Sequence, residues 1–150
     1  MTIEEFQEEM RRRSANIRTD MGRAITNACV LVERTAKKGM ADTEIDSTKV
    51  YKRRSVSHSP SVDFDYPAID TGRLMQSVTH DVEVDGSETV GRVGTNLVYG
   101  KWLEMGTTKM SPRRWLKPSL AINMVNMSVR IVRIGYVIIT PSFTISSIGI

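Results

Sequence analysis

The feature that most constrains the fold is an apolar stripe in the first quarter of the chain. Between residues 3 and about 38, apolar side chains recur at spacings of three and four residues, which places them on one face of an α-helix. The members of this stripe are Ile3, Phe6, Met10, Ile17, Met21, Ala24, Ile25, Ala28, Leu31, Val32 and Thr35. The sequence therefore predicts one long amphipathic helix that buries this stripe.

Signals at both ends define the predicted helix. Thr2 is a preferred N-cap residue, and four glutamates follow it near the positive end of the helix dipole. A lysine pair near the negative end precedes Gly39, a residue type that commonly ends helices. Gly22 weakens the middle of the helix by roughly 1 kcal/mol relative to alanine, which allows a bend between residues 13 and 22.

A β-hairpin and a second helix are predicted further along the chain. Residues 78–84 alternate between apolar and polar types with the period of a β-strand, and residues 89–94 return as its partner. The Asp85-Gly86 pair between them is a strong turn signal. We therefore expect an α+β domain, in which a long N-terminal helix packs on a small, mainly antiparallel sheet and a second helix follows Pro118.

The stretch from residue 99 to residue 120 reads YGKWLEMGTTKMSPRRWLKPSL. Its first seven residues can form one or two helical turns, and Gly106 stands where such a helix needs a left-handed residue to end. Pro118 suits the first turn of a new helix. We expect four side chains of this stretch to be largely buried against the N-terminal helix: Trp102, Leu103, Trp115 and Leu116.

This order of features resembles the tail-component family of long-tailed bacteriophages. The residues that match the family's pattern are Tyr99, Leu103, Glu104, Gly106, Thr107, Met110, Arg113, Trp115, Leu116 and Pro118, with Trp102 in the same aromatic turn. A second signature, similar to the family's Thr-Gly-x-Leu followed by Ser-Ile, lies at Thr71, Gly72, Leu74 and Ser77. The chain departs from the pattern where Pro112 precedes Arg113 and Arg114 replaces a proline. The resemblance covers roughly residues 1 to 122.

The resemblance implies a structural virion protein of a tailed phage or prophage, not an enzyme, and no cofactor. Such a protein forms a homo-oligomeric ring at the head–tail junction, acts in neck assembly or tail completion, and joins the DNA-filled head to the tail. The implied partners are further copies of the chain, head-completion proteins and tail-tube or terminator proteins, with genomic DNA close by in the channel. The implied location is the virion, and the host cytoplasm during assembly.

The charge distribution suggests how copies meet. The net charge is +4, but residues 61–95 carry −5 and residues 96–150 carry +6. Opposite charges can meet when copies associate head to tail, as in a ring. We therefore expect an acidic hairpin to face a basic group of an adjacent subunit. The acidic residues are Asp81, Glu83, Asp85 and Glu88, and the basic residues are Arg113, Arg114 and Lys117.

Length and composition indicate a single domain. The 150 residues include 40% hydrophobic and 25% charged residues, as in ordinary globular chains. A membrane span is not expected, because no apolar run approaches about 20 residues. The polar segment at about 41–67 lacks periodicity and is expected to be a mobile loop. The apolar tail at about 129–150 is atypical of the family and is an added sheet strand, an assembly arm or a divergent end.

Two other functional classes remain open at this point. Several basic runs, such as residues 11–13 and 52–54, suggest a nucleic-acid-binding accessory protein without sequence specificity. A small enzyme is a weaker alternative, because the titratable residues form no recognisable site. His58 and His80 have no acidic partner at a metal-ligand spacing. Cys29, the single cysteine, lies in the helix stripe and is expected to be a buried thiol.

Overall fold

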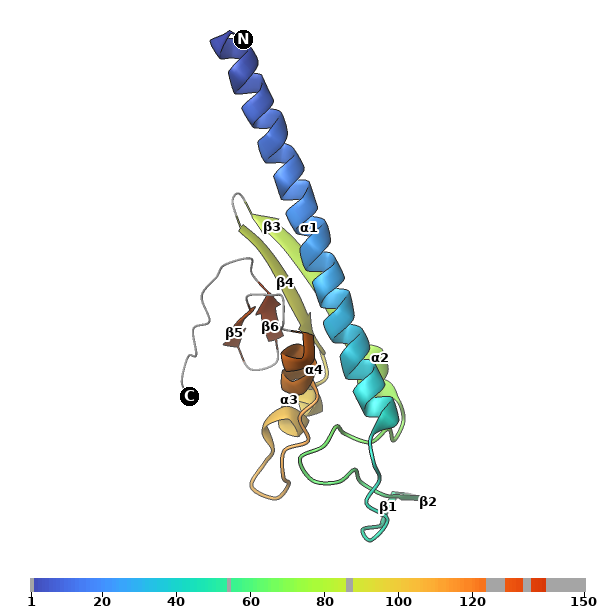
Figure 1. The fold of residues 1–150 in the computed structure, drawn as a ribbon. Helices are drawn as coiled ribbons and strands as arrows, with labels where there is room; N and C mark the ends of the chain where they lie inside the picture. The colour runs from blue at the N-terminus through green and yellow to red at the C-terminus, as the bar shows by residue number, and fades with distance from the viewer. Residues whose placement is uncertain (1, 54, 86–87, 124–128, 134–135, 140–150) are drawn as a thin grey trace.

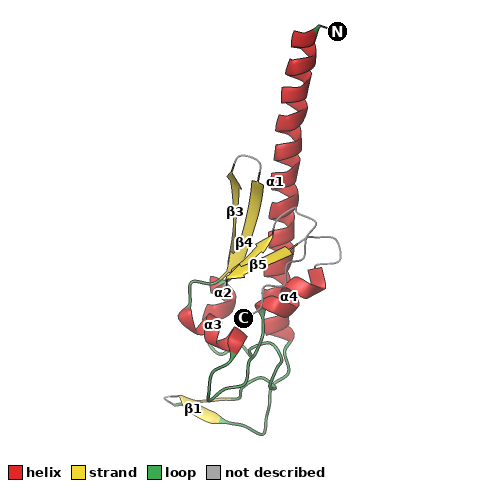
Figure 2. Ribbon diagram, turned by 90° about the vertical axis from the view of Figure 1, so that its left-hand side faces the viewer, coloured by secondary structure: helices red, strands yellow, loops and turns green. Residues whose placement is uncertain are grey.

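The computed structural model describes residues 2–53, 55–85, 88–123, 129–133 and 136–139. It confirms the α+β class: one long helix, α1 (Ile3–Asp42), runs beside a small antiparallel sheet, as Figures 1 and 2 show. The shorter helices are α2 (Arg73–Ser77), α3 (Val98–Met105) and α4 (Leu116–Asn123). They gather near the C-terminal end of α1, so the other end of α1 extends beyond the body (Figure 1).

The start of α1 is the predicted one, but its end is not. Thr2 and Glu5 form a capping box, in which the Glu5 N–H donates to Thr2 Oγ1 (3.2 Å) and the Thr2 N–H donates to Glu5 Oε2 (2.7 Å). The helix continues through Gly39 to Asp42, with Thr43 as its C-cap. A Cβ atom at Gly39 would lie 2.3 Å from the ring of Tyr66. The glycine therefore allows an aromatic ring to approach the helix instead of ending it.

The predicted stripe is buried only in part. In its C-terminal half Ile25, Ala28 and Val32 are buried, whereas Ala24 and Leu31 are exposed, so the prediction of burial is wrong for those two. The residues of α1 that reach the core are Ile25, Ala28, Cys29, Val32, Ala36 and Met40. In the N-terminal half the prediction of burial is wrong, because Ile3, Phe6, Met10 and Ile17 are all more than half exposed. α1 passes through Gly22 as one uninterrupted helix. Its first turns extend past the end of the sheet, where none of the described residues covers them (Figures 1 and 2).

The sheet is built on the predicted hairpin. β3 (Thr79–Asp85) pairs antiparallel with β4 (Glu88–Gly94), from Thr79 opposite Gly94 to Asp85 opposite Glu88. Residues 86 and 87, where a turn was expected, lie outside the described residues. The strand order is β3-β4-β6-β5, since β6 (Tyr136–Ile139) pairs with β4 and β5 (Val129–Arg133) pairs with β6. Part of the atypical tail is therefore added to the sheet, and residues 140–150 are outside the description.

The core lies between α1, the hairpin and α4. Val78 and Val93 from the sheet side and Leu74 from α2 join the buried residues of α1, together with Trp115 and Leu120. α4 begins at Leu116, before Pro118 and not after it, so that Pro118 lies within its first turn. Asn123 near the end of α4 donates from Nδ2 to Thr35 Oγ1 of α1 over 2.9 Å.

The segment at 41–67 contains a small hairpin. β1 (Tyr51–Arg53) pairs with β2 (Val56–His58). The base of the segment is joined by a bridge between Ile45 and Ser61, and Thr43 Oγ1 donates to Asp65 Oδ2 (3.0 Å) and to Tyr66 O (2.9 Å). The expected mobility stays a prediction. Lower amide-exchange protection of the free subunit than of an assembly is the result that we expect.

Candidate assembly surfaces

The stretch at 99–120 folds as two short helices joined by a tight connection. α3 ends at Met105, and Gly106 follows as its C-cap, as predicted. Its φ is +77°, which favours glycine, but its ψ of 178° differs from the left-handed helical conformation that was expected. The Gly106 N–H donates to Trp102 O over 2.8 Å. Thr107 and Met110 then close a turn, in which the Thr107 N–H donates to Met110 O over 2.9 Å. The residues of this stretch that match the family pattern therefore mainly determine the backbone conformation of the connection between α3 and α4.

Glu104 joins the two helices. Its Oε2 atom accepts the N–H groups of Trp115 (2.8 Å) and Leu116 (2.9 Å), and its Oε1 atom accepts the N–H of Lys117 (3.0 Å). These are N–H groups of the first turn of α4, which have no partners within the helix. A carboxylate at this end is also favoured by the helix dipole. Glu104 thus acts as an N-terminal cap supplied from another helix.

Trp115 fixes the same joint from inside. The side chain is 1% exposed, and its Nε1–H donates to Gly100 O over 3.1 Å. A Cβ atom at Gly100 would lie 2.5 Å from Thr95 Cγ2, so a glycine is needed for α3 to pack this closely. The predicted burial is confirmed for Trp115 and Leu116, and Leu103 is partly buried.

The prediction is wrong for Trp102, whose side chain is 53% exposed. Trp102 and Leu103 are neighbours on a two-turn helix, and Leu103 is the one that packs against the core. Val98 (67% exposed) and Met105 (51%) lie one turn before and one turn after Trp102. Together these three side chains form an exposed apolar face on α3, the α3 face, with the partly exposed Tyr99 beside it.

Arg113 does not belong to an open basic surface. Its Nη2 atom donates to Asp63 Oδ1 (3.0 Å) and to Ser61 O (3.3 Å), and only 11% of its side chain is exposed. The expected contact of Arg113 with a neighbouring subunit stays a prediction, and it is less favoured than for an open cation because Asp63 of the same chain already neutralises Arg113. Arg114 and Lys117 are exposed and remain candidates for that contact.

The upstream signature also serves the fold. Gly72 has φ of +73° as the N-cap of α2, and Leu74 is buried. The Ser77 hydroxyl donates to Leu74 O (2.8 Å) and lies 2.6 Å from Thr95 Oγ1, which ties α2 to the chain before α3. Thr71 is exposed. The two signatures are thus brought together in space, since Leu74 and Thr95 both lie against Gly100.

The acidic hairpin is exposed, and its expected contact with a neighbouring subunit stays a prediction. Asp81, Glu83, Asp85 and Glu88 all lie on the surface of β3 and β4. Arg92 on β4 reaches back to Glu83 (2.6 Å) and more loosely to Asp81 (3.8 Å), so part of the negative charge is balanced within the strand pair. Asp85 and Glu88, the two acidic residues nearest the turn, form no such ion pair among the described residues.

Many cations of the basic runs are paired within the chain. Arg11 contacts Glu8, while Arg12 and Arg13 both contact Glu9. The pKa of Glu9 is lowered, mainly by its hydrogen bond from Arg13; burial opposes this, and the charges of Arg12 and Arg13 lower the pKa further. Such pairs leave less free positive charge for phosphate groups than the sequence suggests.

The titratable residues form no metal site within the described part of the chain. His58 Nδ1 lies 2.7 Å from Asp70 Oδ1, and His80 Nδ1 lies 2.5 Å from Glu33 Oε2 on α1. Cys29 is fully buried, which raises the pKa of its thiol to about 11, with Asp81 adding to the effect. None of the described helices is long and apolar enough to cross a membrane.

Sequence reasoning missed one concave region. A cleft of about 660 Å³ lies beside α3, with His58, Ser61, Arg73 and Arg113 among its lining residues. The Ser61 hydroxyl is buried there and has no hydrogen-bond partner in the described structure. The serine-rich composition of residues 55–61 is the only signal of it in the sequence.

Comparisons with models of protein families, with curated proteins and with solved structures found no match for this chain.

Proposed function

We propose that this chain is a structural virion protein of a tailed phage or prophage that assembles as a ring of identical copies at the head–tail junction. In that role it joins the DNA-filled head to the tail and contacts head-completion proteins on one side and tail-tube or terminator proteins on the other. The proposal rests on the two sequence signatures and on one structural observation, the α3 face.

The α3 face is the main structural support for the proposal, because its apolar side chains are exposed and so have no role in the core of the single chain. The motif residues around it have structural roles: Gly106 ends α3, Glu104 caps α4 and Trp115 fills the core. Trp102 lies within the same motif but is 53% exposed. Tryptophan is enriched among the residues that dominate protein–protein binding energies. A neighbouring copy that covers Trp102, Val98 and Met105 would give these side chains the apolar partner that the described residues do not supply.

Charge is expected to orient this association. Asp85 and Glu88 at the tip of the hairpin carry negative charge, while Arg114 and Lys117 at the start of α4 carry exposed positive charge. Contacts of this kind mainly set the encounter rate and the register. Because screening acts over about 8 Å at physiological salt, ring assembly should slow as salt rises, while finished rings persist.

Purified protein tests the proposal directly. Native mass spectrometry and class averages from electron microscopy should show closed rings of the wild-type chain. Trp102→Ala should leave the far-UV circular dichroism spectrum unchanged but shift the population to smaller species. Lys101→Ala, at an exposed position on the same helix, is the matched control and should form rings normally. A wild-type protein that stays monomeric at all concentrations would contradict the proposal.

The site of action needs a second measurement. A symmetry-resolved electron-microscopy map of the purified virion should place the ring between head and tail. If the chain instead binds short DNA duplexes with an affinity that falls steeply with salt and forms no ring, the nucleic-acid-binding alternative is the better one.

A further inference from the structure

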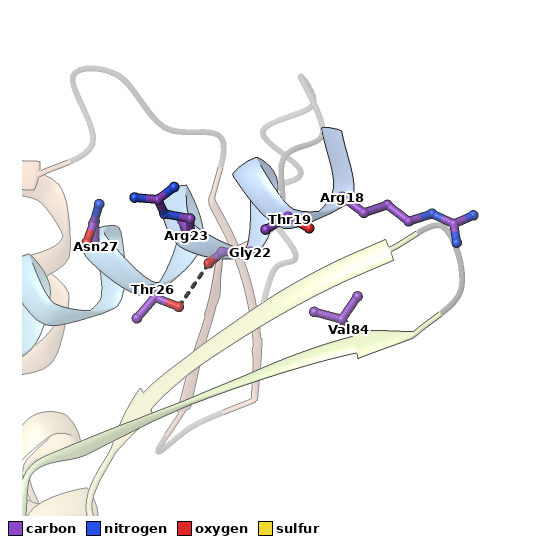
Figure 3. Close-up of a pocket in the computed structure, with 7 residues that line it drawn as sticks. All are labelled: Arg18, Thr19, Gly22, Arg23, Thr26, Asn27 and Val84. Carbon is purple, nitrogen blue, oxygen red and sulfur yellow. Dashed lines mark hydrogen bonds between the residues drawn. The ribbon is translucent and has the colours of Figure 1, made fainter. Parts of the chain in front are cut away.

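The N-terminal part of α1 extends beyond the body and carries an exposed apolar face. Residues 3–20, here called the arm, are exposed apart from Glu9, which is partly buried. Figure 3 shows where the arm leaves the body: Arg18, Thr19 and Gly22 lie above Val84, close to the tip of the hairpin. Eighteen helical residues span about 27 Å, so the arm reaches well away from the sheet.

The apolar side chains of the arm form one stripe. Ile3, Met10 and Ile17 are seven residues apart, which is close to two helical turns, and Phe6 lies one turn after Ile3. Their exposed fractions are 78%, 51%, 59% and 54%, respectively. The stripe is therefore suited to pack against a second helix.

The charges beside the stripe indicate which helix that is. Glu9 and Arg13 lie along one edge of the stripe, four residues apart, and Arg13 Nε donates to Glu9 Oε1 over 2.8 Å. Along the arm as a whole, four glutamates at positions 4–9 are followed by four arginines at positions 11–18. The arm is therefore complementary to a reversed copy of itself.

We infer that the arms of two copies pack antiparallel around a two-fold axis near residue 11. In that arrangement Glu9 of each copy lies beside Arg13 of the other, and the acidic end of each arm lies along the basic part of its partner. Phe6 and Ile3 of one copy meet the region of Ile17 in the other, and the two Met10 side chains approach each other. A parallel pair would instead place the four glutamates of both copies together, which like-charge repulsion disfavours.

This contact differs from the one proposed for the ring. A two-fold contact is the same on both subunits and closes on itself, so it joins copies in pairs. The α3 face lies at the other end of the molecule and stays available for ring formation (Figure 1). Two short helices bury less than the roughly 1,600 Å² of a standard interface, so the pairing should be weak and should fall on dilution.

Cysteine cross-linking of the full chain tests the arrangement. Met10→Cys should form cross-linked dimers with a short bis-maleimide, several-fold more than Glu8→Cys, which lies at the same level on the opposite face of the arm. A mixture of Ile3→Cys and Ile17→Cys chains should cross-link to each other, whereas each chain alone should not. The wild-type chain should not react, because Cys29 is fully buried and burial raises the pKa of its thiol to about 11.

The pattern distinguishes the possible outcomes. Cross-linking of Ile3→Cys to itself as readily as Met10→Cys would show a parallel pair and overturn the inference. Equal yields from Met10→Cys and Glu8→Cys would show that no specific arm contact exists. Rings without arm cross-links would refute this inference alone, while arm cross-links without rings would refute the proposed ring alone.

Discussion

Replacing Glu104 with alanine should destabilise the protein by about 2–3 kcal/mol, because three backbone N–H groups lose their acceptor. A helix N-cap is typically worth about 1 kcal/mol, and a hydrogen bond to a charged group about 1.5–3 kcal/mol. Trp115 and Leu116 are buried, so water cannot freely replace the carboxylate at their N–H groups. Lys117 is exposed, and its N–H can bond to water, which keeps the loss below the sum of three bonds.

Urea unfolding monitored by far-UV circular dichroism would measure this loss. Glu104→Gln keeps one acceptor oxygen without the charge and should fall between the wild type and the alanine variant. Glu44→Ala removes a carboxylate from an exposed position and is the matched control. If Glu104→Ala is within about 0.5 kcal/mol of Glu44→Ala, the range usual for surface substitutions, the capping argument is wrong.

Three further predictions concern the stability of the free chain. Trp115→Ala should cost about 3–5 kcal/mol in urea unfolding, because a fully buried aromatic side chain leaves a cavity. Gly22→Ala should raise the midpoint of thermal unfolding and add up to about 1 kcal/mol, since the new Cβ atom would meet nothing within 4 Å; a lower midpoint would contradict this. Although burial raises it, the pKa of Glu33 is lowered below 4.5 overall by Lys37 and His80. A carboxyl group whose pKa is lower in the folded state stabilises the fold at pH values above its unfolded pKa, and this stabilisation is lost as the pH falls through its folded pKa. The difference in free energy of unfolding between wild type and Glu33→Gln should therefore shrink below about pH 4.5.

Local signals in the sequence predicted several elements well. Thr2 and Glu5 contain the whole capping box, and the alternation at residues 78–84 is set by neighbours in the chain. Gly106 was predicted to end α3 because no other residue type adopts a left-handed conformation as easily. In each case the deciding interaction lies within a few residues, so the sequence pattern contains it.

Interactions between distant residues could not be predicted in the same way. Glycine commonly ends helices, which is why Gly39 was predicted to end α1. Its actual role is set by Tyr66, which is 27 positions away and packs on it. The capping of α4 by Glu104 depends on how the connection between two helices folds back. Helical spacing predicted the stripe on α1, yet spacing cannot say whether a stripe is covered by the same chain or by another one. The same limit applies to Trp102, whose neighbour Leu103 took the inward position.

The base of the segment at 41–67 has a practical consequence for handling the protein. The Asp46 N–H donates to Pro60 O (2.8 Å), the Val62 N–H donates to Glu44 O (3.2 Å), and Arg113 holds Asp63 from the side of the body. The chain is therefore held in place both before β1 and after β2, by contacts that do not involve the hairpin itself. A protease cut within the hairpin should leave two pieces that stay associated and folded, and a tag inserted there should be accepted. The chain can thus be split or labelled at this hairpin while the arm and the α3 face stay free to assemble.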